Sequence, residues 1–279
     1  MRKLLSLTLL LFGLGVSQEA HAQQPTKTLQ VEDVTSGKFY AYTAGRGMRS
    51  TSDGKYYTLM DDKHTAILRY SFHTGQLIDT LFSVQKAREC EFKTFDDYIL
   101  EPKGNHILII TDQEAVYRRS SKGNAFHYDV RRNRVEPLRS TSGKVMIPPF
   151  SPDGRMVAFV RDGNIFIKKF EYDTEVQVTS DAVRNKVMNG TTDWVYEEEH
   201  EATRLMTWSE DNNYLAFVRT DESGVDEYSM PIYGTTQYPG AYTYKYPKAG
   251  TPNSKVSVHI YNGTDRSQKP ITFKSEPYY

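Results

Sequence analysis

The sequence has little of what many enzymes and membrane proteins depend on. Cys90 is its single cysteine, so neither an intrachain disulfide nor a cysteine-based metal site can form, and we expect a buried thiol. Charge is balanced, with 35 Lys and Arg against 35 Asp and Glu, so no overall field favours nucleic acid or an anionic membrane. The one long apolar run, residues 4–16, is too short to span a bilayer.

Sequence motifs for catalysis are also absent. There is no G-x-S-x-G nucleophile elbow, no H-E-x-x-H metal motif and no Gly-rich phosphate loop that follows a strand and opens a helix. His106 and His259 alternate with apolar residues, which indicates structural histidines in strands. We therefore expect no catalytic residue, no metal and no cofactor in this chain.

Residues 1–22 have the pattern of a secretory signal peptide. Arg2 and Lys3 precede the apolar run, and Ala20-His21-Ala22 forms a small-x-small cleavage site. No cysteine follows to carry a lipid, and the mature chain is expected to start at Gln23. The pattern predicts an exported, soluble protein.

The mature chain predicts an all-β fold built from a repeat. Aromatic residues make up 13% of the sequence and include 20 Tyr, and short apolar strands follow polar turns. The turn residues Gly54, Gly104, Gly154 and Asn212 are 50, 50 and 58 residues apart, and each of the four turn-plus-strand units is followed by a second hairpin. Four strands per unit at this period are typical of β-propeller blades, whereas a β-sandwich would not need the same turn at a fixed period.

Known propellers close with about four to eight blades, and this sequence stops where a fifth turn and strand would begin. We therefore expect residues 23–279 to be part of a propeller, about four blades of a larger ring, from a truncated chain or a fragment.

One segment departs from the strand pattern. Residues 189–201, Asn-Gly-Thr-Thr-Asp-Trp-Val-Tyr-Glu-Glu-Glu-His-Glu, predict a short acidic helix with Asp193 as its N-cap. Glu197 and Glu201 would repel at i,i+4, and a cation would relieve the cluster. The alternative is a solvated acidic face, which is the usual role of a run of charges.

Strand parity places this helix. Strand direction alternates within a blade, so the second-to-third-strand loop and the connection to the next blade emerge on the same face. The helix lies between blades three and four, and residues 114–123 form the corresponding loop of blade two, so Arg118 and Arg119 should share a face with the Glu cluster. Arg118 could equally be an ordinary loop cation. Residues 220–254, rich in Tyr and Pro, are long for a loop and suggest a functional arm or an ordered surface loop.

Three stretches carry a family resemblance. Residues 189–199, the Tyr244-Lys-Tyr-Pro-Lys-Ala-Gly250 string and Tyr117-Arg-Arg-Ser120 resemble the propeller domain of dipeptidyl peptidase IV in its bacterial periplasmic form. The resemblance implies an eight-bladed propeller that caps an α/β-hydrolase domain. It also implies a periplasmic serine exopeptidase, which releases dipeptides with Pro or Ala at the second position from peptide N-termini.

The resemblance also assigns roles to residues. Glu198 and Glu199 would bind the α-ammonium of the peptide substrate, Arg118 would reach the substrate carbonyl, and the arm from Val225 to Lys248 would form a homodimer surface. Glu197 and Glu201 would remain structural or solvated neighbours. Arg119 stands where the family often has His, and His200 where an apolar residue is common; we expect neither to touch the matched residues.

Two buried carboxylates at a fixed distance from a nucleophile would select peptides with a free N-terminus, because only an ammonium offsets the desolvation of the carboxylates. The triad would lie outside this chain, so residues 23–279 alone should be inactive. The alternative is a non-catalytic periplasmic propeller that binds peptides or proteins.

Overall fold

The computed structural model describes residues 28–39, 47–138, 143–146 and 148–273, and it divides into two units, residues 1–46 and 47–279. The signal peptide predicted for residues 1–22 lies outside the described residues. In the first unit, the short helix α2 (Val31–Thr35) follows Gln30. No helix of the described part is both long and apolar enough to cross a membrane.

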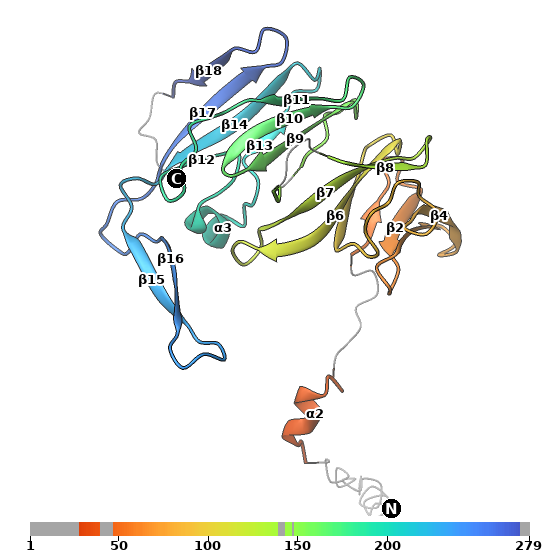
Figure 1. Ribbon diagram of the computed structural model, residues 1–279, viewed down its shortest axis with the longest axis horizontal. Helices are drawn as coiled ribbons and strands as arrows, with labels where there is room; N and C mark the ends of the chain where they lie inside the picture. The colour runs from red at the N-terminus through yellow and green to blue at the C-terminus, as the bar shows by residue number, and fades with distance from the viewer. Residues whose placement is uncertain (1–27, 40–46, 139–142, 147, 274–279) are drawn as a thin grey trace, which may run out of the picture. The chain divides into compact units, whose positions relative to one another are not determined.

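The second unit contains a series of antiparallel sheets (Figure 1). In the first two sheets, strands that follow one another in sequence also lie side by side. The first sheet comprises β1 (Arg49–Ser50), β2 (Tyr56–Met60), β3 (Ala66–Ser71) and β4 (Leu77–Ser83). The second comprises β5 (Asp97–Leu100), β6 (His106–Ala115), β7 (Ser121–Asp129) and β8 (Arg134–Pro137).

The next two sheets keep this antiparallel order with additions at their edges. The third contains β9 (Met156–Arg161), β10 (Asn164–Lys169) and β11 (Thr174–Gln177), and Met146 and Phe150 form isolated bridges to β9. The fourth contains β12 (Val187–Asn189), β13 (Met206–Trp208), β14 (Tyr214–Asp221), β17 (Lys255–Asn262) and β18 (Gln268–Ile271), with both β12 and β13 paired to β14. The predicted all-β class is confirmed.

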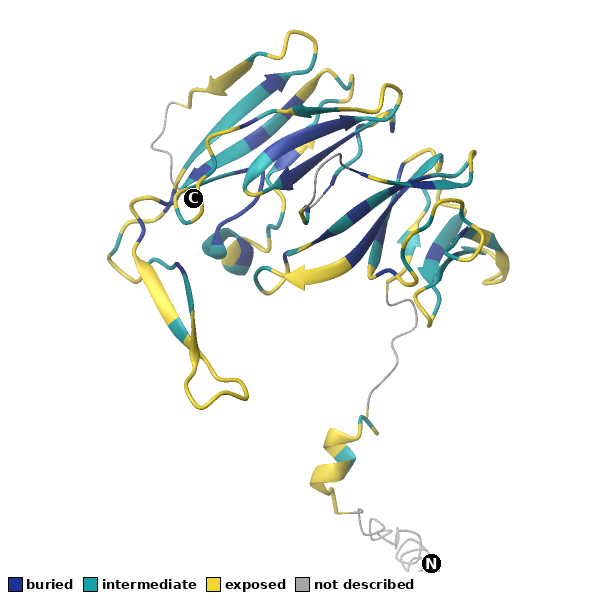
Figure 2. Cartoon of the chain, viewed as in Figure 1, coloured by how far each residue is buried: buried dark blue, intermediate teal, exposed yellow. Residues whose placement is uncertain are grey.

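The segment predicted as a functional arm or an ordered surface loop contains strands that were not predicted. It contains a separate two-stranded hairpin of β15 (Glu227–Ile232) and β16 (Gly240–Lys245), which is exposed over most of its length (Figure 2). Pro231 lies within β15 and obscured the strand pattern, but a two-stranded ribbon has only edge strands, where proline is tolerated.

Alternating side chains pack successive sheets against each other. On β6, Ile107 and Ile109 join the core that contains Ile67 and Phe82 of the first sheet, whereas Leu108 and Ile110 join Val157 and Phe159 of the third. On β9, Ala158 and Val160 then pack with Leu215 and Phe217 of the fourth sheet. Because neighbouring side chains of a strand point to opposite faces, the two middle sheets are buried on both faces.

The repeated turn has the same hydrogen bonds in three of its four copies. In the third copy, Ser151 Oγ accepts from the Met156 amide at 3.0 Å, and Asp153 Oδ1 accepts from the Arg155 amide at 3.0 Å. Thr51 with Asp53 and Ser209 with Asp211 repeat this arrangement. In the second copy the buried Glu101 replaces both side chains and accepts from the amides of Lys103 and Asn105 at 2.8 and 2.9 Å. These side-chain bonds explain why the turn recurs.

Gly154 and Gly54 form a matched pair for testing this packing. Both have left-handed φ angles, +77° and +65°, but a Cβ on Gly154 would overlap the Glu101 carboxylate whereas a Cβ on Gly54 meets nothing. We expect Gly54→Ala to lower the free energy of unfolding by about 1 kcal/mol, the cost of the left-handed backbone. Gly154→Ala should cost a further ~1–3 kcal/mol, because Glu101 is buried and must give up its turn amides to move. Urea unfolding of both variants measures this difference, and equal losses would contradict it.

Candidate functional site

The acidic segment forms the helix α3 (Trp194–His200), between β12 and β13. The predicted N-cap is confirmed: Asp193 Oδ1 accepts from the Tyr196 amide at 2.9 Å. Its other oxygen, Oδ2, accepts from the Ser254 hydroxyl at 2.6 Å, which ties the helix start to the segment before β17. The helix ends at His200, and its C-cap, Glu201, is in the left-handed conformation with φ 54°.

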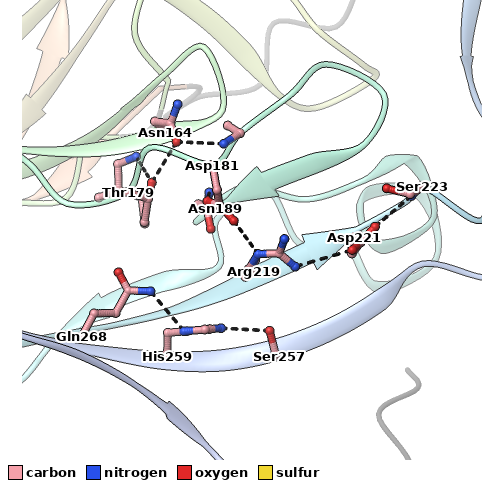
Figure 3. A network of polar contacts seen from close by, with 12 residues as sticks. Asn164, Thr179, Asp181, Asn189, Arg219, Asp221, Ser223, Ser257, His259 and Gln268 are labelled. Atoms are coloured by element: carbon pink, nitrogen blue, oxygen red, sulfur yellow. Dashed lines mark hydrogen bonds and ion pairs between the residues drawn. The ribbon is translucent and has the colours of Figure 1, made fainter.

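The residues before the helix are fixed by a polar network (Figure 3). The side-chain Nδ2 of the buried Asn189 donates to Asp181 Oδ1 at 2.9 Å, and Arg219 Nε donates to Asp181 Oδ2 at 2.7 Å. Gly190 follows at φ +73°, where a Cβ would lie 3.0 Å from Ile165 Cδ1. Asn and Gly at these two positions therefore satisfy a local hydrogen-bonding and steric requirement.

The β6–β7 turn lies against this helix (Figure 1). The predicted loop, residues 114–123, is shorter than expected, since β6 reaches Ala115 and β7 starts at Ser121. The Glu197 side chain is fully buried, and its Oε1 accepts from the amides of Arg119 and Ser120 at 2.5 and 2.9 Å. A helix carboxylate thus holds the turn by its backbone, which accounts for the structural role expected of Glu197.

The structure brings Arg118 and Glu198 into contact, on the shared face that strand parity predicted for Arg118 and the Glu cluster. Arg118 Nε lies 3.1 Å from Glu198 Oε2, and the exposed fractions of the two side chains are 72% and 12%. Glu199 is exposed, so the expectation of two buried carboxylates is wrong for this residue: it follows Glu198 on the outer side of a short helix.

Arg119 also departs from expectation. It contacts matched residues: its Nη1 lies 4.0 Å from Glu198 Oε2 and donates to the Glu197 carbonyl at 3.1 Å. Its Nη2 donates to Glu201 Oε1 at 3.1 Å. The side chain is 34% exposed and reaches from the turn to the helix, a position that sequence spacing alone does not reveal.

Tyrosines and a tryptophan form an aromatic cluster beside the helix. Tyr244 of β16 lies at its centre and is 7% exposed. Its ring centroid is 5.4–6.4 Å from those of Tyr117, Trp194, Tyr228, Tyr242 and Tyr246. Burial, then the neighbouring tyrosines and Glu198, raise the pKa of Tyr244, so its phenol stays neutral. The alternation of Tyr242, Tyr244 and Tyr246 is a period-two pattern that could have indicated this strand, although no strand was predicted there.

Besides Glu197, a second carboxyl is buried near the start of α3, the end of β16 and the β6–β7 turn. Glu222, just after β14, is 3% exposed, and its amide donates to the Lys186 carbonyl. Burial, then the nearby Asp193 charge, raise the pKa of Glu222 to about 7, while Lys245 lowers it. Burial and then Glu222 also raise the pKa of Tyr117. This carboxyl was not identified from the sequence, because a lone Glu after a strand carries no signal of burial.

His106, His127 and Cys90 occupy structural positions. His127 Nε2 and His106 Nδ1 share a hydrogen bond of 2.8 Å, and burial lowers the pKa of His127 to about 3. Cys90 is half-buried rather than fully buried, with Sγ 3.5 Å from the Phe92 carbonyl. Within the described ranges no three His, Cys, Asp or Glu side chains are grouped so as to hold a metal ion.

The protein-family model described as the dipeptidyl peptidase IV N-terminal region matches residues 101–279. The matched residues include α3, the β6–β7 turn and the β15–β16 hairpin. The chain belongs to this family. Dipeptidyl peptidase 4 of Porphyromonas gingivalis, a solved structure, is 57% identical with a TM-score of 0.86 and covers 90% of this chain and 36% of its own.

Curated relatives of this dipeptidyl peptidase IV-type chain carry related names. Dipeptidyl-aminopeptidase B of Aspergillus niger is 35% identical over 175 residues, 58% of this chain and 19% of that protein. A protein of Phaeosphaeria nodorum named probable dipeptidyl-aminopeptidase B is 30% identical over 269 residues, 85% of this chain and 28% of that protein. The chain therefore spans roughly a fifth to a third of the length of the relatives it matches.

The raised pKa of Glu222 predicts how the stability of this family member depends on pH. In the unfolded chain the carboxyl titrates near 4.5, and in the folded chain near 7, so the folded state binds more protons between these values. Stability should fall as pH rises from about 4.5 to 7, by roughly 3 kcal/mol at most. Glu222→Gln, which stays neutral, should raise the free energy of unfolding at pH 8 relative to wild type.

Urea unfolding between pH 5 and 8 tests this prediction, and the exposed Glu210→Gln serves as the matched control, which should keep the wild-type pH dependence. If Glu222→Gln and wild type show the same pH dependence, the buried carboxyl does not ionise as described.

Proposed function

We propose that this chain is the substrate-recognition part of a secreted serine exopeptidase, which releases dipeptides with Pro or Ala at the second position from peptide N-termini. The observation that carries the proposal is the Arg118–Glu198 ion pair of 3.1 Å, formed between a turn and a helix in a member of the dipeptidyl peptidase IV N-terminal region family. Relatives named dipeptidyl peptidases or dipeptidyl-aminopeptidases support the reaction class.

Glu198 and Glu199 are the proposed ligands of the substrate's α-ammonium. An ammonium carries up to three hydrogen-bond donors, and two adjacent carboxylates can accept them in charge-assisted bonds. The Glu198 side chain is largely desolvated, at 12% exposed, so its charge acts at low local dielectric. Glu199 is exposed and supplies the second acceptor from the outer side.

Arg118 completes the proposed site. Its Nε holds Glu198 while the rest of a guanidinium that is 72% exposed keeps donors for a peptide carbonyl. A blocked or internal peptide brings no ammonium to offset the carboxylates and would bind poorly. The site thereby fixes the position of a substrate by its free N-terminus.

The proposal extends to the architecture and location. The four large sheets would be four blades of an eight-bladed propeller formed by residues 23 onward, with α3 inserted between the third and fourth. The packing of each middle sheet between two neighbours supports this arrangement. Residues 1–22 would direct export across the inner membrane to the periplasm, and the catalytic triad would belong to an α/β-hydrolase domain.

The Glu pair has a direct test in the full-length enzyme that contains this chain. Glu198→Ala should abolish hydrolysis of a Gly-Pro chromogenic substrate, at a cost on the order of 3–5 kcal/mol in transition-state binding, and Glu199→Ala, at an exposed carboxylate, should weaken that binding by about 1.5–3 kcal/mol, the worth of a charged hydrogen bond. Steady-state kinetics measures the loss, and the exposed Glu210→Ala serves as control. Wild-type rates in either site variant would contradict the ammonium site, whereas an inactive wild type would favour a non-catalytic peptide-binding propeller.

The hairpin arm, Val225 to Lys248, is the proposed homodimer surface. Tyr233 and Tyr238 at its end are 81% and 79% exposed, and Ile232 is 52% exposed. Such exposed apolar groups on one ribbon favour burial against a second copy. Tyr233→Asp should convert a dimer into a monomer in sedimentation velocity, since it places a charge in the interface. Tyr172→Asp, at a tyrosine outside the arm that is 70% exposed, should leave the dimer intact, and a dimer that survives the Tyr233 change would contradict the arm's role.

A further inference from the structure

The residues next to the Arg118–Glu198 pair form a second connection between the same two elements. Arg119 follows Arg118 on the β6–β7 turn, and Glu197 precedes Glu198 on α3. The Glu197 carboxylate accepts from the backbone of the turn, and the Arg119 guanidinium donates to the backbone of the helix. We call this reciprocal arrangement the Arg119–Glu197 clasp.

The clasp meets hydrogen-bonding needs on both sides. A short helix leaves its last carbonyls without internal donors, and Arg119 Nη1 donates to one of them, that of Glu197, at 3.1 Å. The cation also lies at the negative end of the helix and pairs with Glu201, where a positive charge is favoured. On the turn, Glu197 Oε1 receives two amides that would otherwise lack acceptors.

The Glu197 carboxylate that holds the turn is itself buried and only partly satisfied. Glu197 is fully buried, and among the described residues its Oε2 has no hydrogen-bond partner. A buried carboxylate is costly unless its oxygens are hydrogen-bonded, so the two turn amides on Oε1 stabilise it, while the Arg119 guanidinium bonds the backbone carbonyl of the same residue. Arg119 Nη1 also lies 4.0 Å from Glu198 Oε2, the same oxygen that pairs with Arg118.

We propose that Arg119 is a positioning residue for the ammonium site: through the Arg119–Glu197 clasp it fixes the turn against the helix, and so holds Arg118 and Glu198 at the spacing that a peptide N-terminus requires. The inference rests on the proposed exopeptidase function. Arg119 adjoins Arg118 in sequence, and Glu197 adjoins Glu198. A shift of Arg119 or Glu197 therefore displaces the neighbouring site residue through a single peptide unit.

The test compares Arg119→Ala, Arg119→Lys and wild type in the full-length enzyme, with a Gly-Pro chromogenic substrate. The control is Arg132→Ala, since Arg132 is 78% exposed and lies in an ion pair with Asp129 outside the site. Arg119→Ala should raise KM by about 10- to 100-fold, the cost of a small misplacement of binding groups, with a smaller change in kcat. Lysine keeps the charge but cannot bridge the Glu197 carbonyl and Glu201 in the same way, so Arg119→Lys should recover part of the loss.

The outcomes separate this inference from the function on which it rests. If wild type is active and Glu198→Ala is inactive, but both Arg119 variants keep the wild-type KM, the positioning role is wrong and the exopeptidase function stands. If Arg119→Ala fails to fold, a wild-type KM in the folded Arg119→Lys variant still overturns the role. A wild type without activity overturns both. A KM effect in Arg119→Ala that Arg119→Lys partly reverses, with Arg132→Ala unchanged, supports the clasp.

Discussion

The Glu197 carboxylate, buried against the backbone amides of Arg119 and Ser120, is the interaction on which the candidate site depends. A buried carboxylate is stable only where donors meet it, and here the donors belong to a turn about 80 residues away in sequence. The helix and the β6–β7 turn therefore stabilise each other's positions. This coupling brings the adjacent Glu198 and Arg118 into contact, so one structural bond between two segments organises the neighbouring polar pair.

The sheets provide the rigid background for that contact. Side chains of β6 and β9 divide between cores on both of their faces, so the strand that ends at the turn is packed against two neighbouring sheets. The polar network of Asp181, Asn189 and Arg219 fixes the strand that leads into the helix (Figure 3). Aromatic packing around Tyr244 joins the hairpin to both the turn and the helix. Three segments distant in sequence thus converge on one small surface.

Much of this arrangement could be predicted from the sequence because its causes are local. The turn before each strand recurs because Ser or Thr and Asp bind nearby amides, and Asp193 caps its own helix. Strand alternation then predicted that Arg118 and the Glu cluster would share a face. The rest depends on tertiary contacts that leave no periodic trace: the burial of Glu222, the exposure of Glu199, and the contact of Arg119 with Glu197 and Glu198. Pro231 hid a strand that pairs only within its own hairpin.

The central claim is that this helix recognises a free peptide N-terminus. The most direct measurement is a crystal structure of the full-length enzyme with a peptide that begins X-Pro bound to it. The account predicts the α-ammonium nitrogen within about 3 Å of carboxylate oxygens of both Glu198 and Glu199, the distance of a charge-assisted hydrogen bond, with Arg118 donating to a peptide carbonyl. A bound peptide whose ammonium contacts neither carboxylate would contradict it.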